Sequence, residues 1–237
     1  MLFNVELLLS AASGMGISLN AEMLGRFERY ASMLTEWNKN INLTSVTDPD
    51  GIALRHFADS LSLLTACEIP EGSSLADVGA GAGFPSLPVL IARPDLKITM
   101  LDGTDKKVAF LRAALTELDL KAEAVHMRAE EAGRLPGLRE SFDFAAARAV
   151  ADMRGLSEYC LPLVKPGGRF VAMKGPGYEP DLQAAKEAAL LLGGSLESVK
   201  PLVLPGGISR TLIIIKKISQ TPPKYPRTSA QIAKKPL

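Results

Sequence analysis

Short apolar runs alternate with amphipathic segments through the middle of this chain. The runs have the length of buried strands and lie at residues 75–78, 97–101, 122–125, 142–147 and 169–173. Between them, apolar residues at a helical spacing predict helices at 105–119, 152–164 and 180–192. Strands that alternate with helices predict an α/β fold with a parallel, doubly wound sheet.

Both ends of the chain depart from this alternation. Residues 195–204 and 209–218 are separated only by Pro205-Gly206-Gly207, which predicts an antiparallel hairpin at the end of the sheet. Residues 1–70 show no strand pattern, and they carry apolar positions at a helical spacing and a helix start at Asp48-Pro49. We therefore expect an N-terminal helical cap over residues 1–70, a sheet domain over 71–218 and a tail over 219–237.

The first predicted strand runs into an acid and three glycines at alternate positions, which are Asp77, Gly79, Gly81 and Gly83. Glycine has no side chain and tolerates positive φ, so such a turn brings bare backbone close to a ligand. A helix is predicted to follow from Leu87, with its free N–H groups facing the same ligand. This arrangement is typical of a nucleotide-type cofactor site at the carboxyl edge of a parallel sheet.

The glycine spacing separates two classes of cofactor. Dinucleotide sites use Gly-x-Gly-x-x-Gly, whereas this chain has Asp-x-Gly-x-Gly-x-Gly. A carboxylate beside the helix N-terminus disfavours a pyrophosphate and favours a cation such as the ammonium and sulfonium of S-adenosylmethionine (AdoMet). With the terminal hairpin, this predicts a class I AdoMet-dependent methyltransferase with a Rossmann-like sheet. A dinucleotide site and a glycine turn without a ligand are the alternatives.

Further candidates follow the other strands. Asp102 ends the second strand, where an acid can bind both ribose hydroxyls or can instead stabilise the start of the next helix. Phe84 is either a ligand contact or a core residue. Ala129 and Glu130 follow the third strand and are either contacts to the edge of the base or a solvated helix start.

Two basic residues end the fourth and fifth strands. Arg148 follows an apolar run and needs polar partners there, so it is a candidate for binding the cofactor carboxylate or a substrate phosphate. Lys174 either faces the same crevice or is a solvated strand end. Both are candidates for positioning the substrate, and no catalytic acid or base is nominated.

The chemistry is narrowed by motifs that are missing. The fourth strand ends in Arg148-Ala149-Val150 and not in the Asn/Asp-Pro-Pro-aromatic motif of enzymes that methylate exocyclic base amines. Attack at pyrimidine C5 needs a cysteine nucleophile, and Cys67 and Cys160 lie outside the crevice motifs. A target with a free lone pair, such as guanine N7, needs only in-line alignment with the methyl group and the sulfur.

The composition limits which binding partners and which cellular compartment are expected. The formal charge is +1, so nucleic-acid binding requires local clustering of basic residues. Two distant cysteines and two histidines indicate a reducing cytosol and no disulfide framework or metal site, and no apolar run has the length of a membrane span. The basic, proline-containing tail at 219–237 is either a solvated extended segment or an arm that binds RNA phosphates.

The chain resembles the bacterial small-subunit rRNA guanine-N7 methyltransferases (the RsmG or GidB family) over nearly its whole length. The resemblance is carried by residues 37–44, 55–61, 77–85, 128–131, 148–150 and 172–175, and in the tail by 224–227 and 234–237. The Asn-Leu-Thr sequence at 42–44 and the His-Phe-x-Asp-Ser sequence at 56–60 are the specific segments, because very many methyltransferases share the glycine motif.

This resemblance implies AdoMet as the methyl donor, no metal, and transfer to N7 of one guanine of 16S rRNA (guanine 527 in the usual numbering). Matching positions imply cofactor contacts at Gly79, Phe84, Asp102, Gly103, Thr104, Ala129, Glu130 and Arg148, to which the glycine motif adds Asp77 and Gly81. Arg55 and His56 are expected on the cofactor or RNA side of the site, or on a helix face packed on the sheet. We expect a cytoplasmic monomer whose partner is 16S rRNA or the small ribosomal subunit.

The chain also departs from the family pattern. Ser86 stands where a glycine is expected, and Gly103-Thr104 replaces the more usual serine after the acid, so the family pattern is matched at Asp102 and not at these two residues. The tail is less basic and less glycine-rich than usual, which affects RNA binding and not the chemistry. An AdoMet-dependent methyltransferase acting on another RNA, a protein or a small molecule is the alternative.

Overall fold

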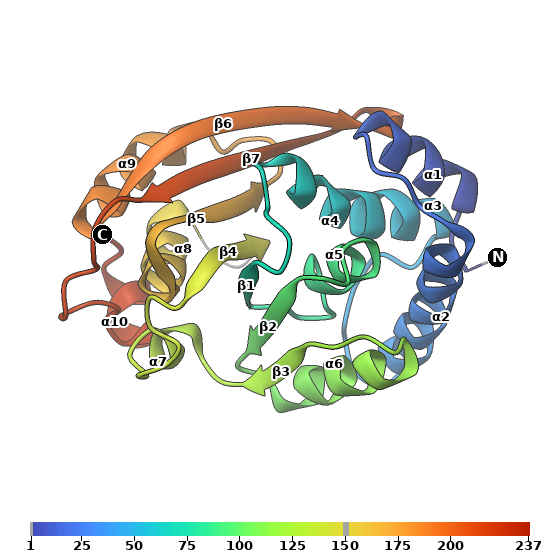
Figure 1. Ribbon diagram of the computed structural model, residues 1–237, viewed down its shortest axis with the longest axis horizontal. Coiled ribbons are helices and arrows are strands. Elements are labelled where there is room, and N and C mark those ends of the chain that lie inside the picture. Colours follow the sequence, from blue (N-terminus) through green and yellow to red (C-terminus); the bar gives the residue numbers. More distant parts are fainter. Residues whose placement is uncertain (1, 149–151) are drawn as a thin grey trace.

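The computed structural model describes residues 2–148 and 152–237, which form a central sheet between two layers of helices (Figure 1). Its strands are β1 (Ser74–Val78), β2 (Lys97–Asp102), β3 (Glu123–His126), β4 (Phe142–Arg148), β5 (Val164–Lys174), β6 (Gly194–Leu204) and β7 (Ile208–Lys217). They are ordered β3-β2-β1-β4-β5-β7-β6. The strands from β3 to β5 pair in parallel, while β7 is antiparallel to both β5 and β6. The parallel sheet and the terminal hairpin are both confirmed.

Helices cover the two faces of the sheet and bury a separate apolar core on each. One face carries α1 (Val5–Gly14), α2 (Ala21–Asn38), α5 (Ser86–Ala92) and α6 (Asp105–Glu117). The other carries α7 (Ala129–Ala132), α8 (Met153–Cys160) and α9 (Glu179–Leu191), with α10 (Ser229–Lys234) packed against α8. In the part of the chain described here, no helix combines the length and the apolar character needed to cross a membrane.

Residues 49–65 depart from the single regular helix that the sequence predicts. They form α3 (Pro49–Gly51), a π-helix (Ile52–Ala58), α4 (Asp59–Leu61) and a 3-10 turn (Ser62–Thr65). The start is as expected, because the Asp48 side chain accepts a hydrogen bond from the Gly51 amide at 2.6 Å. The π-turn arises because the Asp59 amide donates to the carbonyl of Leu54, five residues earlier.

The helix predicted at 152–164 is shorter, and the strand after it begins earlier. The α-helix α8 ends at Cys160, Leu161–Leu163 form a 3-10 turn, and β5 starts at Val164. The pairing of β4 with β5 shifts register between Phe142 and Phe144, and this bulge accommodates Pro166-Gly167-Gly168 within the strand. Short buried apolar runs fit either a helix or a strand, so periodicity alone does not separate the two.

The segment after Ile218 is packed on the sheet domain and is not a solvated extended segment, which was one of its two predicted forms. Thr221, Tyr225 and Ile232 are buried, and the segment ends in α10. By composition alone, this tail is basic and its charges have no assigned partners. The fold instead provides a buried acid, Glu158, that pairs with Arg227.

Candidate functional site

The glycine loop connects β1 to α5 at the carboxyl edge of the sheet. The amides of Gly79 and Ala80 both donate to the Leu101 carbonyl of β2, at 2.9 and 3.1 Å. Gly81 has a φ of 59°, and a Cβ added there would approach only the carbonyl oxygen of Gly79, at 3.8 Å. The loop therefore leaves open space beside Gly81, as expected where backbone approaches a ligand.

A tyrosine of the helical cap holds this loop in place. The Tyr30 hydroxyl donates to the Ala82 carbonyl at 2.5 Å, and burial raises the pKa of Tyr30 well above its usual value, so the hydroxyl keeps its proton. At Gly83, an added Cβ would come within 2.5 Å of Leu87 and 3.1 Å of the Tyr30 hydroxyl. Sequence reasoning missed this role, because the helical pattern marks Tyr30 only as an apolar position.

Asp77 lies beneath the loop and is fully buried. Neither carboxyl oxygen has a hydrogen-bond partner of standard geometry within the described ranges, although the Ser86 hydroxyl and amide lie close enough to oppose the shift of its pKa. Burial nevertheless raises the pKa of Asp77 to about 6. Asp77 is thus sealed from solvent and has no exposed surface with which to contact a ligand directly.

Asp102 joins the glycine loop to the start of α6. One carboxyl oxygen accepts a hydrogen bond from the Gly81 amide at 2.9 Å, and the other accepts one from the Thr104 amide at 2.8 Å. The side chain thus stabilises the helix start, one of the two expected roles. Each carboxylate oxygen has a second lone pair, which leaves acceptors for ligand hydroxyls.

A cavity at the carboxyl ends of β1, β2 and β3 is lined by five predicted residues, which are Gly79, Asp102, Gly103, Ala129 and Glu130. Three residues that sequence reasoning did not single out also line it: Met127, Tyr159 and Ser229. Glu130, which is 9% exposed as a residue, brings a second carboxylate to the lining beside that of Asp102. Carboxylates accept hydrogen bonds, so this lining fits a ligand with amine or hydroxyl groups.

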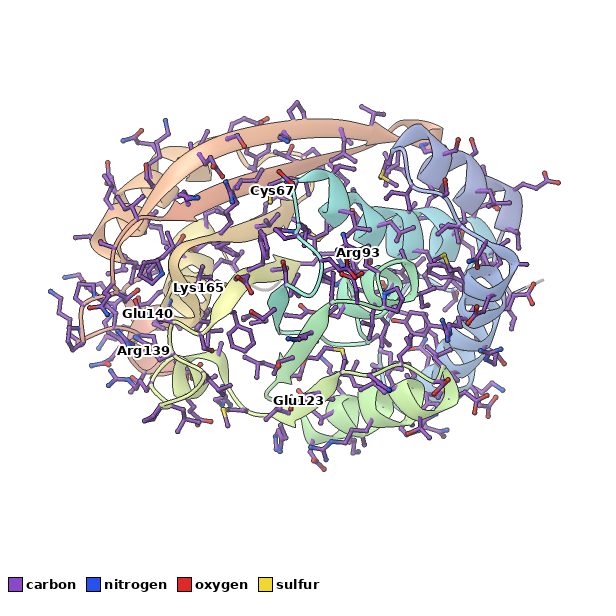
Figure 2. The ribbon with its side chains drawn as sticks, viewed as in Figure 1. Cys67, Arg93, Glu123, Arg139, Glu140 and Lys165 are labelled. Atoms are coloured by element: carbon purple, nitrogen blue, oxygen red, sulfur yellow. The ribbon has the colours of Figure 1, made fainter. Side chains whose placement is uncertain are left out.

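Size alone does not identify the site. A cavity of about 500 Å³ lies at the opposite edge of the sheet, against about 240 Å³ for the cavity beside Asp102. Both basic groups of the larger cavity are already paired, Lys165 with Asp143 at 2.5 Å and Arg169 with Glu197 at 2.6 Å. Lys165 is labelled in Figure 2. This cavity contains none of the predicted site residues.

Arg148, Phe84 and His56 form a second group of predicted residues. The His56 and Phe84 rings stack with centroids 4.3 Å apart, and the Arg148 guanidinium lies 4.8 Å from the centre of Phe84. Phe84 also packs against Tyr30 and Phe57 in the core of the helical cap. The structure therefore places Phe84 in the core, with one edge of the cluster formed by Arg148.

The His56 ring uses both of its nitrogens. Arginine cannot accept a hydrogen bond, so Nδ1 is the acceptor from Arg148 Nη2 at 3.4 Å, and Nε2 carries the proton that it donates to Thr44 Oγ1 at 2.7 Å. Burial and the charge of Arg148 lower the pKa of His56 to about 4, so the ring is neutral at pH 7. Asn38 accepts hydrogen bonds from the Leu43 and Thr44 amides and so shapes the loop that presents Thr44.

Asp59 binds two arginines and was not among the predicted site residues. It is 3% exposed, and its oxygens accept from Arg148 Nη1 at 3.0 Å and from Arg210 Nε at 2.9 Å. Arg148 Nη1 also donates to the carbonyl of Arg55, which lies in the π-helix, at 3.0 Å. Asp59 lies inside the His-Phe-x-Asp-Ser segment, and this motif could have pointed to it. No sequence pattern pointed to Arg210.

The remaining predicted site residues lie at the margins of these two groups. Thr104 is exposed and contacts Asp102 through its amide, while the Arg55 side chain points to solvent with Asp48 3.6 Å away. Lys174 ends β5 opposite Thr211 of β7. Residues 149–151, part of the motif after the fourth strand, lie outside the described residues.

The remaining reactive groups are the two cysteines and the side chains that could hold a metal. Both cysteines are free, and burial raises the pKa of the Cys160 thiol well above its usual value. Over residues 2–148 and 152–237, no three His, Cys, Asp or Glu side chains come together as a metal site requires.

Known proteins are similar to this chain in sequence and in fold. The family model GidB, described as rRNA small subunit methyltransferase G, matches residues 23–212. The chain is 46% identical over 236 residues to the ribosomal RNA small subunit methyltransferase G of Acetivibrio thermocellus, covering 98% of this chain and 96% of that protein. It is 47% identical over 238 residues to the protein of the same name from Lactobacillus johnsonii, covering 99% and 100%. A solved SAM dependent methyltransferase from Aquifex aeolicus has a TM-score of 0.53 at 20% identity, covering 71% of this chain and 94% of that one.

Proposed function

This chain belongs to the rRNA small subunit methyltransferase G family, and from that membership we propose that it methylates N7 of guanine 527 in 16S rRNA. It is an AdoMet-dependent rRNA methyltransferase with a class I fold. The structural observation that supports the cofactor site is the cavity beside Asp102, which is lined by Gly79 of the glycine loop and by two acidic residues, Asp102 and Glu130.

AdoMet fits this cavity by the chemistry of the groups that line it. We assign the second lone pairs of Asp102 to the ribose hydroxyls, because these are donors that a carboxylate binds in pairs. The Ala129 amide and the Glu130 carboxylate, on the first turn of α7, are assigned to the edge of the adenine. Gly79 and Gly81 supply the backbone over which the cofactor lies. Bound AdoMet supplies an electrophilic methyl group.

Arg148 and its neighbours are assigned to the substrate end of the site. Arg148 and Arg210 share the single charge of Asp59, so the group keeps a net positive charge at the carboxyl end of β4. Such a charge fits the carboxylate of the cofactor or an RNA phosphate, which a guanidinium binds through two hydrogen bonds. Arg55, His56 and Lys174 complete the assigned substrate side.

The proposed transfer is an in-line displacement that requires no general base. Guanine N7 has a free lone pair, so the protein needs only to hold it in line with the methyl group and the sulfur. His56 supports this mechanism, because both of its ring nitrogens are engaged by Arg148 and Thr44. The ring is placed to orient Arg148 and not to take up a proton.

The test is methylation of small subunits isolated from cells that lack this enzyme. With radiolabelled AdoMet, we expect label at a single guanine, mapped by cleavage at N7-methylguanine. Label in another RNA, in a ribosomal protein or in a small molecule would support the alternative methyltransferase instead. Absence of transfer to any of these, with AdoMet binding intact, would contradict the proposed function.

We also propose that the enzyme acts as a monomer in the cytoplasm. Two free cysteines that form no disulfide support a reducing compartment. Sedimentation of the purified protein with and without AdoMet tests the monomer, and a stable dimer would contradict it.

A further inference from the structure

The C-terminal segment, residues 221–237, reaches the cavity that we assign to AdoMet. Ser229, the first residue of α10, lines it together with Asp102, Ala129 and Glu130. We propose that this segment forms one wall of the AdoMet site on its adenine side, and that Ser229 is a cofactor-site residue. The proposal rests on the assigned cofactor site and adds to it a segment that composition marks as a basic tail.

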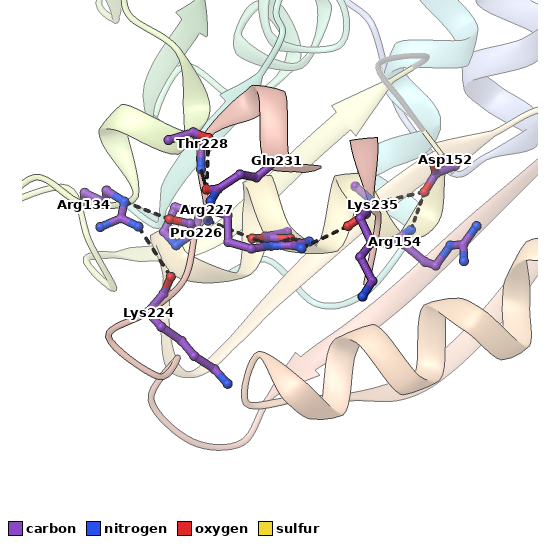
Figure 3. Close-up of polar contacts among 11 residues, drawn as sticks. Arg134, Asp152, Arg154, Lys224, Pro226, Arg227, Thr228, Gln231 and Lys235 are labelled. Atoms are coloured by element: carbon purple, nitrogen blue, oxygen red, sulfur yellow. Dashed lines mark hydrogen bonds and ion pairs between the residues drawn. The ribbon is translucent and has the colours of Figure 1, made fainter. Parts of the chain in front are cut away.

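A buried ion pair holds the segment in place. Glu158 of α8 is fully buried, and it accepts hydrogen bonds from the Arg227 backbone amide at 2.7 Å and from its Nε and Nη2 at 2.9 and 2.6 Å. Arg227 Nη1 donates to the Lys235 carbonyl at 2.9 Å, which ties the two ends of α10 together (Figure 3). The next residue after Glu158 is Tyr159, which also lines the cavity.

Two arginines of the sheet domain bind the backbone of the segment. Arg134 Nε donates to the Pro226 carbonyl at 2.8 Å, as Figure 3 shows. Arg139 donates to the Tyr225 carbonyl at 2.8 Å and to the Thr221 carbonyl at 2.7 Å. The residues that these bonds join are more than eighty positions apart in sequence, so the bonds attach the segment to the sheet domain.

The segment also packs on α7, the helix that carries Ala129 and Glu130. A Cβ added at Gly133, directly after α7, would come within 3.0 Å of Pro226. Pro226 therefore lies against the end of this helix. The segment thus contributes to the site twice, directly through Ser229 and indirectly by supporting the helix whose first turn faces the cavity.

The start of the segment is anchored by polar groups that its own sequence does not reveal. The Thr221 amide donates to Glu140 at 2.6 Å, and the buried Lys217 lies 3.1 Å from the same carboxylate. Figure 2 shows Glu140 and Arg139 on the side of the molecule where the chain ends. With Arg227 paired to Glu158, the segment docks as a structural element, and its exposed charges are those of Lys224, Lys234 and Lys235.

The experiment compares Ser229→Phe with Ala230→Phe in the full-length protein, and titrates each with AdoMet by calorimetry. Both changes add the same ring to neighbouring positions of α10, but only Ser229 lines the cavity, whereas Ala230 is exposed. We expect Ser229→Phe to raise the Kd for AdoMet at least tenfold and Ala230→Phe to change it less than twofold. An unchanged Kd for a folded Ser229→Phe protein would overturn the proposal.

A second measurement on the unmodified protein does not depend on the variant folding. Hydrogen exchange of residues 221–237 is followed with and without AdoMet, and we expect slower exchange at the amides around Ser229 when AdoMet is bound. Unchanged exchange throughout this segment would overturn the proposal. A loss of rRNA affinity in Ser229→Phe with an unchanged AdoMet Kd would overturn it in favour of an RNA-binding arm.

Asp102→Ala separates failure of this inference from failure of the assigned site. The assigned site predicts that Asp102→Ala raises the AdoMet Kd about 5- to 150-fold, the range for losing charge-assisted hydrogen bonds. If Asp102→Ala has this effect and Ser229→Phe has none, the C-terminal inference alone fails. If Asp102→Ala also leaves the Kd unchanged, the assigned site itself is wrong.

Discussion

At the scale of single residues, the glycine loop contains one position where a side chain is disfavoured. Gly81 combines a φ of 59° with open space on the side where its Cβ would lie. A side chain there would be strained and would also occupy the space assigned to AdoMet. The neighbouring Gly83 is constrained differently, because Leu87 and Tyr30 fill the space around it.

We therefore expect Gly81→Val to abolish AdoMet binding measured by calorimetry. The matched control is Gly137→Val, since Gly137 also has a positive φ, of 91°, and open space around it, but lies away from the cavity. The control also places a branched side chain at a positive φ, and it should bind AdoMet with wild-type affinity. Equal losses in the two variants would show that strain, and not the site, explains the effect.

At the scale of elements, Asp59 joins three parts of the fold. It lies on α4, and its two arginine partners lie on β4 and β7. In the π-helix before it, the Arg55 carbonyl accepts a further hydrogen bond from Arg148. These contacts hold the helical cap on the carboxyl edge of the sheet, where Arg148 is assigned to the substrate.

Asp59→Ala should therefore destabilise the protein. Removing one partner from a buried ion pair costs about 3–5 kcal/mol. We expect the lower end, about 3 kcal/mol, because the Arg148 and Arg210 side chains keep 15% and 20% exposure. Urea unfolding measures the change. Glu36→Ala, which breaks an exposed pair with Lys39, is the control and should leave stability nearly unchanged. Similar values for both variants would contradict this role for Asp59.

At the scale of the whole molecule, two buried groups near the loop act on stability in opposite directions. Burial raises the pKa of Asp77 to about 6, so between its ordinary 3.8 and 6 the folded state binds more protons and stability falls as pH rises. Burial and Arg148 lower the pKa of His56 from 6.5 to about 4, so over that range the unfolded state binds more protons and stability rises with pH.

Single variants should expose these opposing contributions between about pH 4.5 and 6, a window set by the two pKa shifts. Asp77→Asn leaves the His56 contribution, so the free energy of unfolding should rise with pH more steeply than in the wild type. His56→Asn leaves the Asp77 contribution, so it should fall with pH relative to the wild type. Urea unfolding at several pH values measures both slopes. If both variants changed the pH slope in the same direction, the opposing contributions of Asp77 and His56 would be contradicted.

The local sequence pattern was sufficient to predict the sheet and to recognise the cofactor motif. Strand and helix periods, the hairpin signal and the glycine spacing depend on residues close in sequence, and each predicts an element or turn directly. For the same reason Gly79, Asp102 and Ala129 were predicted and line one cavity, because the carboxyl ends of parallel strands meet at one edge. The resemblance to a family added Arg55, His56 and the methylated base.

What sequence by itself determined is thus the fold class, the cofactor and the residues at the strand ends, since short-range pattern encodes them. Only the tertiary structure decided which distant groups neutralise one another. Glu158 binds Arg227, and Asp59 binds Arg148 and Arg210, across separations of 69, 89 and 151 positions. A charge counted along the chain has no assigned partner until folding brings one within a few ångströms. That is why composition left the tail as either a solvated segment or an RNA-binding arm, whereas the fold shows it packed on the sheet domain through Arg227 and Glu158.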